Sequence, residues 1–161
     1  MGTQPISKEP IIRIYDRKFR LTSPTTPGIV VIVKPRRLRV LLVDDDVLVR
    51  LAIDRQLEAL GCDVLSVDKG REAITLLEKG MRFDVLVTDL NLPDVDGRSV
   101  AWTAAAFSPR MRMVFMSGSA PGEPLEPADA PFLLKPFSTT ALANAIAGAI
   151  PLDPPLRPRR R

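Results

Sequence analysis

Short apolar runs and amphipathic stretches alternate along the chain from Leu38 onward. The run Leu38–Val43 is almost entirely apolar, which is typical of a strand that is buried on both faces. Apolar residues then recur at helical spacing from Val49 to Leu60, and Gly61 is placed to end that helix. Because strand and helix patterns go on alternating as far as residue 150, the sequence predicts βαβ units and one parallel sheet.

The later elements follow the same pattern, with one exception. The segment Ser119–Pro131 contains four prolines, which do not fit the interior of a helix. We therefore expect the helix between the last two strands to be shortened or missing. The further strands are predicted at Cys62–Val67, Phe83–Thr88, Arg112–Met116 and Phe132–Leu134, and the further helices at Arg71–Lys79, Ser99–Phe107 and Thr139–Ile150.

Two flanking segments differ in charge from the body of the chain. The first 39 residues hold nine Lys and Arg against two acidic residues, and the last ten hold four Arg against one Asp. We expect residues 1–37, which contain five prolines, to be an extension that is partly disordered or a small hairpin. Residues 151–161 are expected to be a basic disordered tail. Such arms could contact nucleic acid or an acidic partner, or only aid solubility.

Missing residue types exclude several chemistries. The chain has no histidine, which excludes a Ser-His-Asp hydrolase, a histidine-ligated zinc site and a phosphohistidine on this chain. Its one cysteine, Cys62, excludes an internal disulfide and a multi-cysteine metal cage, and lies in an apolar run that predicts a buried structural thiol. No apolar run approaches the ~18 residues of a membrane helix. We therefore expect a cytoplasmic protein without membrane insertion.

Carboxylates gather where the predicted strands end. Asp44, Asp45 and Asp46 follow the first strand, Asp89 follows the third, and ligands of parallel sheets bind at this edge. Unit charges about 4 Å apart repel one another by ~4 kcal/mol at an effective dielectric constant of about 20. The carboxylates are therefore either solvated or arranged around a cation. Asp46 is expected to cap the helix that follows.

Other residues near this edge are given structural roles. We expect Asp94 and Asp96 to be loop or capping residues and not metal ligands. Gly97 is expected to open the third helix without a chemical role, or to permit a positive backbone angle. Trp102, within that helix, is expected to serve packing.

Four motifs at this edge together resemble the receiver domain of two-component response regulators. They are DDD from Asp44, TDLNLPDVDG from Thr88, MSGS from Met116 and FLLKPF from Phe132. They follow the first, third, fourth and fifth predicted strands in that order, and the resemblance covers residues 38–150. It implies an α/β, flavodoxin-like (βα)5 fold, a doubly wound parallel five-stranded sheet, here with its fourth helix shortened or missing.

The resemblance implies a phosphorylation site that uses Mg²⁺. Asp89 would be the phosphoacceptor and would also ligate the metal. Asp45 would ligate Mg²⁺ directly and Asp44 would assist from beside it. The backbone carbonyl of Asn91 would supply a further ligand. Oxygen atoms of this kind are the ligands that Mg²⁺ prefers.

The resemblance assigns three more residues. Ser117 would donate a hydrogen bond to the phosphoryl group, and Lys135 would pair with it as a cation. The Lys135–Pro136 peptide bond is expected to be cis. Phe132 is either a switch residue that repacks when phosphorylation draws Ser117 inward, or simply a core residue.

These assignments predict a stand-alone response regulator receiver. A sensor histidine kinase or a histidine phosphotransfer protein would donate the phosphoryl group. Only eleven residues follow Ile150, so output is expected through contact with an unknown downstream protein or through phosphate relay. The proline-rich segment would shift partner recognition to itself, to the last helix or to an arm.

The same assignments bear on enzyme activity and leave two alternative functions. The chain would catalyse its own phosphorylation and dephosphorylation, but it is not expected to be an enzyme that acts on a separate metabolite. One alternative is a protein-binding receiver module that works without phosphorylation, which the intact site disfavours. The other is a nucleic-acid binder that uses its basic arms, which the net charge of −6 on residues 40–151 disfavours.

Overall fold

The five strands run parallel in the order β2-β1-β3-β4-β5. The computed structural model describes residues 36–149, so the predictions for the two flanking segments lie outside the described residues except at Arg36 and Arg37. The strands are β1 (Arg39–Val43), β2 (Asp63–Val67), β3 (Val85–Asp89), β4 (Arg112–Ser117) and β5 (Phe132–Leu134). The helices are α1 (Val47–Ala59), α2 (Gly70–Glu78), α3 (Gly97–Phe107) and α4 (Thr139–Ala149).

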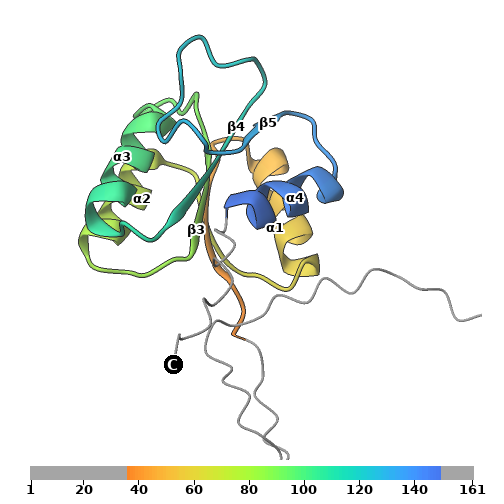
Figure 1. The fold of residues 1–161 in the computed structure, drawn as a ribbon, viewed down its shortest axis with the longest axis horizontal. Coiled ribbons are helices and arrows are strands. Elements are labelled where there is room, and N and C mark those ends of the chain that lie inside the picture. The colour runs from red at the N-terminus through yellow and green to blue at the C-terminus, as the bar shows by residue number, and fades with distance from the viewer. Residues whose placement is uncertain (1–35, 150–161) are drawn as a thin grey trace, which may run out of the picture. The chain divides into compact units, whose positions relative to one another are not determined.

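The helices cover both faces of this sheet. Figure 1 shows α1 and α4 on one side of the strands and α2 and α3 on the other. From β1 the chain moves to β2 on one side and then returns to β3 on the other, so the winding direction changes between β1 and β3. The predicted doubly wound sheet is confirmed. Ligands of such sheets bind at the carboxyl ends of the strands where the direction changes.

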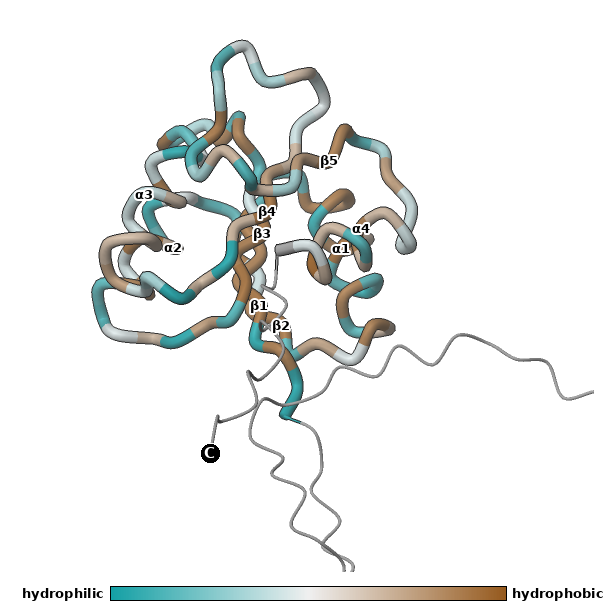
Figure 2. The backbone as a smooth tube through the Cα atoms, in the orientation of Figure 1, coloured by the Kyte–Doolittle hydropathy of each residue, from teal (hydrophilic) through white to brown (hydrophobic). Residues whose placement is uncertain are grey.

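Buried strands form the centre of the molecule. All of β3 and the last four residues of β1 are buried, as their uninterrupted apolar runs predicted. Figure 2 shows hydrophobic backbone through the strands, with hydrophilic positions along the outer turns and loops. Alternate residues of each strand enter two separate clusters, one under α2 and α3 and one under α1 and α4. Each fully buried Val or Leu contributes about 1.5–3 kcal/mol to folding.

Helix ends agree with the sequence signals. The Asp46 carboxylate accepts hydrogen bonds from the backbone N–H groups of Leu48 and Val49 at 2.8 and 3.1 Å, so its predicted role as the cap of α1 is confirmed. Gly61 and Gly80 follow α1 and α2 with φ angles of 82° and 78°, the left-handed conformation that glycine adopts most easily. Helix α3 begins two residues before its predicted start because Asp96 caps it, as its side chain accepts from the Arg98 N–H at 2.7 Å.

The connection between β4 and β5 contains no helix. Residues 118–131, here called the β4–β5 crossover, are all described and form bends, one hydrogen-bonded turn at residues 128–129 and irregular backbone. Figure 1 shows them as a long loop above the sheet. The crossover lies on the α3 side, where Leu125 and Ala130 pack against the cluster under α2 and α3. The prediction of a shortened or missing fourth helix is therefore confirmed.

One packing prediction is wrong. Trp102 does not enter the core, because its side chain lies on the outer surface of α3 with 77% of the residue exposed. Cys62, in contrast, is buried as predicted, and burial raises the pKa of its thiol. Within residues 36–149 no helix has the length and apolar character that crossing a bilayer requires. The cytoplasmic location stays a prediction.

Candidate functional site

Strand register brings the predicted site residues to one edge of the sheet. Val43 of β1 pairs with Thr88 of β3, so Asp44 and Asp89, which come one residue later, are neighbours. Ser117 ends β4 opposite Leu134 of β5. The backbone N–H of the next residue, Lys135, donates to the Ser117 carbonyl at 2.8 Å. Four strands therefore each bring at least one predicted site residue to this edge.

Lys135 joins two of the carboxylates. Its Nζ lies 2.5 Å from Oδ2 of Asp44 and 2.5 Å from Oδ2 of Asp89. Burial alone would lower the pKa of this ammonium group, but the two carboxylates outweigh burial and raise the pKa of Lys135. The amine is therefore held in its charged form at the centre of the site. The Lys135–Pro136 peptide bond is cis, as predicted.

Asp44 is the most deeply placed carboxylate of the site. Its side chain is fully buried, and burial raises its pKa although the Lys135 ammonium acts in the opposite direction. Oδ1 accepts a hydrogen bond from the Asp46 N–H at 3.0 Å, while the Arg50 guanidinium donates to the Asp44 carbonyl at 2.6 Å. Each carboxylate oxygen therefore has a donor, which offsets part of the cost of burying the charge.

The loop after β3 fixes Asp89 and Ser117 together. The backbone N–H of Asn91 donates to Oδ1 of Asp89 at 2.9 Å. The side-chain amide of the same residue donates to the Ser117 hydroxyl at 2.8 Å. Ser119 also donates to this hydroxyl through its backbone N–H at 3.3 Å. Asn91 thus holds both groups, and the part played by its side chain was not foreseen from the sequence.

Three carboxylates converge closely enough to share a metal ion. One oxygen each from Asp44, Asp45 and Asp89 can be chosen so that all lie within 4.8 Å of one another. Asp44 and Asp89 are buried, whereas Asp45 is exposed at the rim. Lys135 offsets one of the three negative charges, and the excess of hard oxygen ligands fits Mg²⁺. The part predicted for the Asn91 carbonyl stays a prediction.

Two residues outside the carboxylate cluster hold the connection between β3 and α3 in place. An added Cβ at Gly97 would lie 1.9 Å from the Asp89 carbonyl oxygen, so only glycine fits there. The predicted role of Gly97 at the start of α3 is confirmed, and its close approach to Asp89 is new. The Asp94 carboxylate accepts from the Gly70 and Arg71 N–H groups at 3.1 and 2.9 Å. It thereby caps α2, whose own N-cap residue Lys69 makes no side-chain cap bond.

Phe132 lies in β5 on the side of α3. It is partly buried and packs against the apolar cluster under α2 and α3. This placement fits the core role that the sequence left open, while the switch role stays a prediction. Asp96 caps α3. Asp94 and Asp96 therefore both have the structural roles predicted for them.

Comparison with known proteins shows which protein family this sequence matches. The sequence model described as the response regulator receiver domain matches residues 40–147. The response regulator receiver protein CpdR of Brucella abortus is 33% identical over 112 residues, which cover 67% of this chain and 92% of CpdR. The sensor kinase CckA of the same organism is 35% identical, but the match covers 66% of this chain and only 12% of CckA.

Solved structures share the same fold. A response regulator receiver protein from Sinorhizobium medicae is 32% identical with a TM-score of 0.63, covering 69% of this chain and 92% of that one. The receiver domain of the sensor histidine kinase PA1611 from Pseudomonas aeruginosa, whose active-site cleft coordinates a magnesium ion, has a TM-score of 0.62. The two sequences are 23% identical, and the match covers 71% of this chain and 98% of that domain. This likeness therefore shows the fold alone.

Proposed function

Because the chain belongs to the response regulator receiver family, we propose that it accepts a phosphoryl group on Asp89 from a phosphohistidine donor. The observation that carries the proposal is the contact of Lys135 with both Asp89 and the buried Asp44. An ammonium at that point neutralises the nucleophile's surroundings before an anionic phosphoryl group arrives. In the reaction a carboxylate oxygen of Asp89 bonds to phosphorus while the phosphorus–nitrogen bond of the donor breaks.

Hydrogen bonds prepare the Asp89 carboxylate for this attack. Its Oδ1 is held by the Asn91 N–H and its Oδ2 by the Lys135 ammonium. Both bonds fix the plane of the carboxylate, which reduces the orientational freedom that must be lost in the transition state. Lys135 can keep its contact with Asp44 while it pairs with the incoming phosphoryl oxygens.

The Ser117 hydroxyl is free to donate a hydrogen bond. A hydroxyl has one proton to donate and two lone pairs that accept. The Ser117 oxygen already accepts from the Asn91 amide and from the Ser119 N–H. Its proton is therefore left for a phosphoryl oxygen on Asp89, which is the role that we assign to it.

We propose Mg²⁺ as the cofactor of this step, with Asp44, Asp45 and Asp89 as its carboxylate ligands and the Asn91 carbonyl as a further ligand. The fit rests on the convergence of the three carboxylates, whose charge Lys135 offsets only in part. When bound, the ion would neutralise negative charge on the transferring phosphoryl group. The chain itself would contribute the orientation of Asp89 and exclude water from the buried side of Asp44.

An exposed apolar surface beside the site supports a protein donor. Helix α1 starts directly after the carboxylates, and Val47, Leu48 and Leu51 on it are 54%, 75% and 49% exposed. We assign this surface to the sensor histidine kinase or histidine phosphotransfer protein that would present the phosphohistidine. Replacing Leu48 and Leu51 with Ser should slow transfer from such a protein and leave phosphorylation by acetyl phosphate unchanged.

Output would follow from contact with a downstream protein or from phosphate relay, and not from reaction with a separate metabolite. The absence of a helix in the β4–β5 crossover alters the surface next to β5. We therefore assign recognition of the downstream protein to the crossover and to the exposed side of α4. Substitutions there should weaken partner binding without affecting phosphorylation.

Phosphorylation by a small donor tests the proposed function. The protein is incubated with acetyl phosphate and Mg²⁺, and the bound phosphoryl groups are counted by intact mass. The wild type should gain one, whereas Asp89→Asn and the wild type in EDTA should gain none. Equal labelling of wild type and Asp89→Asn would rule out Asp89 as the acceptor, and equal labelling in EDTA would rule out the metal.

A further inference from the structure

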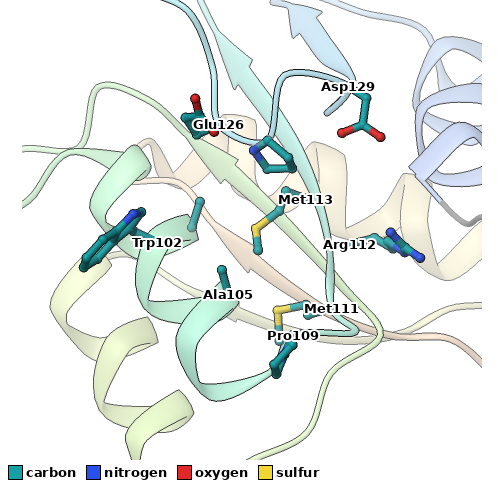
Figure 3. Close-up of a pocket in the computed structure, with 10 residues that line it drawn as sticks. Trp102, Ala105, Pro109, Met111, Arg112, Met113, Glu126 and Asp129 are labelled. Carbon is teal, nitrogen blue, oxygen red and sulfur yellow. The ribbon is translucent and has the colours of Figure 1, made fainter.

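A groove lies beside the β4–β5 crossover, the connection that contains no helix. Its volume is about 380 Å³, and it runs between α3, the start of β4 and the β4–β5 crossover (Figure 3). The site described above lies at the opposite end of β4, after Ser117. The lining of the groove includes Trp102, Pro109, Met111, Met113, Glu126 and Asp129. An aromatic side chain, two methionines and two prolines, Pro109 and Pro127, make a groove suited to an apolar or proline-rich segment.

Trp102 makes this groove unusual. It is the one tryptophan of the chain, and 77% of it is exposed. Figure 3 shows its ring on the outer side of α3, at the edge of the groove and pointing away from Met111 and Met113. Leaving so large an apolar ring in water forfeits the stabilisation of its burial. A ligand that covered the ring would recover that stabilisation.

The groove also has a charge preference. The β4–β5 crossover holds three acidic residues, Glu123, Glu126 and Asp129, and no basic residue. Glu126 and Asp129 line the groove, and Arg112 at the start of β4 is the one basic residue among its lining. The last eleven residues of the chain, 151–161, contain four Arg, four Pro and one Asp. The two segments are therefore complementary in charge.

We propose that this groove binds residues 151–161 of the same chain. Proline-rich segments favour the polyproline II conformation, which needs no backbone hydrogen bonds and commonly docks in aromatic-lined grooves. In this arrangement prolines of the segment cover the Trp102 ring and arginines pair with Glu126 and Asp129. The segment takes the place that a fourth helix would fill.

The segment is long enough to reach the groove. It starts two residues after α4, which packs against β4 and β5 from the opposite face of the sheet. The groove lies on the other face of β4, and β5 is the last strand of the sheet, so only one strand has to be passed. Eleven residues in the polyproline II conformation span about 34 Å, whereas neighbouring strands are about 5 Å apart. Tethering at millimolar effective concentration makes even a weak contact populated.

Quenching of Trp102 fluorescence by acrylamide tests the proposal in the full-length protein. The first variant replaces Arg157, Arg159, Arg160 and Arg161 with Ser. The matched control removes the same number of charges from the other end of the chain, by replacing Arg13, Arg17, Lys18 and Arg20 with Ser. A third variant, Glu126→Lys with Asp129→Lys, reverses the charge of the groove.

The tail variant and the groove variant should both increase the quenching constant, by about twofold or more if an intramolecular contact covers the ring most of the time. The control should match the wild type, and a synthetic peptide of residues 151–161 should lower quenching of the tail variant. Added salt should increase quenching of the wild type. Equal quenching in wild type and tail variant would overturn the proposal. So would an increase in the control alone, or protection that disappears on dilution, which would indicate a second copy as the occupant.

Discussion

The backbone carbonyl of Asp89 lies directly against Gly97, where an added Cβ would come within 1.9 Å of its oxygen. The N–H of Gly97 also donates to the carbonyl of Leu90 at 3.0 Å. The start of α3 is thus packed against the backbone of the proposed phosphoacceptor. The chain turns so tightly between β3 and α3 that any side chain at this glycine would displace the residue that carries the chemistry.

Gly97→Ala should therefore destabilise the protein and also impair phosphorylation. Overpacking against a backbone atom that cannot move independently should cost at least about 2 kcal/mol. Urea unfolding measures the free energy, and acetyl phosphate labelling measures the function. Gly122→Ala is the control, because nothing lies within 4 Å of an added Cβ there. A Gly97→Ala variant as stable and as active as this control would contradict the close packing.

Asp94 should stabilise α2, although it lies 24 residues after the start of that helix in the sequence. Asp94→Ala removes the acceptor for the Gly70 and Arg71 N–H groups and should cost about 1 kcal/mol in unfolding free energy, as loss of a helix cap does. Asp94→Asn keeps an acceptor and should lose less. Urea unfolding of the three proteins at neutral pH makes the comparison. No difference between Asp94→Ala and wild type would show that the cap contributes nothing.

The cap should also give the stability a pH dependence. Although burial acts in the opposite direction, the N–H groups of Arg71 and Gly70 lower the pKa of the Asp94 carboxyl below its ordinary value of 3.8. A lowered pKa means that the stabilisation is complete above pH 3.8 and is lost as the pH falls through the folded-state pKa. The difference in stability between wild type and Asp94→Ala should therefore shrink in acid. A difference that stayed constant down to low pH would contradict this role of the charge.

Asn91 should act through Ser117. Asn91→Ala removes the amide that holds the Ser117 hydroxyl and should slow acetyl phosphate labelling by up to about tenfold, the worth of one hydrogen bond. If the amide works only by positioning the hydroxyl, the double variant with Ser117→Ala should be no slower than Ser117→Ala alone. Additive losses in this double-mutant cycle would show that the Asn91 side chain acts independently of Ser117.

Lys135→Met removes the charge of Lys135 and keeps an unbranched side chain of similar volume. The substitution leaves the buried Asp44 carboxylate without its ammonium partner, which should cost about 3–5 kcal/mol in EDTA. Mg²⁺ should restore more stability to this variant than to wild type, because both cations neutralise the same carboxylates. Thermal unfolding with and without Mg²⁺ provides the comparison. Equal effects of Mg²⁺ on the two proteins would argue against a shared cluster.

Much of the fold could be predicted because local signals and long-range packing agree. The apolar runs of β1 and β3 indicated central strands, and Asp46 and Gly61 indicated where α1 begins and ends. The carboxylate cluster could also be predicted, since parallel strands bring their carboxyl ends to one edge. Boundaries shifted by one or two residues where caps and loop bonds, and not hydrophobicity, decide them.

Contacts that depend on how two loops face each other could not be predicted. Asp94 caps a helix that begins 24 residues earlier, and its sequence neighbours give no sign of that partner. The amide bond from Asn91 to Ser117 depends on how two loops face each other. Trp102 was expected to pack because it is apolar, but the proline-rich crossover supplies no helix to cover it.

Mapping the phosphoryl group to a residue tests the central claim most directly. An acyl phosphate on aspartate is reduced by borohydride to homoserine, which peptide mass spectrometry can locate. After treatment with acetyl phosphate and Mg²⁺, we predict homoserine at position 89 and at no other aspartate, with the yield abolished by EDTA. Homoserine at Asp44 or Asp45 instead, or none under conditions where the protein takes up phosphate, would contradict Asp89 as the phosphoacceptor.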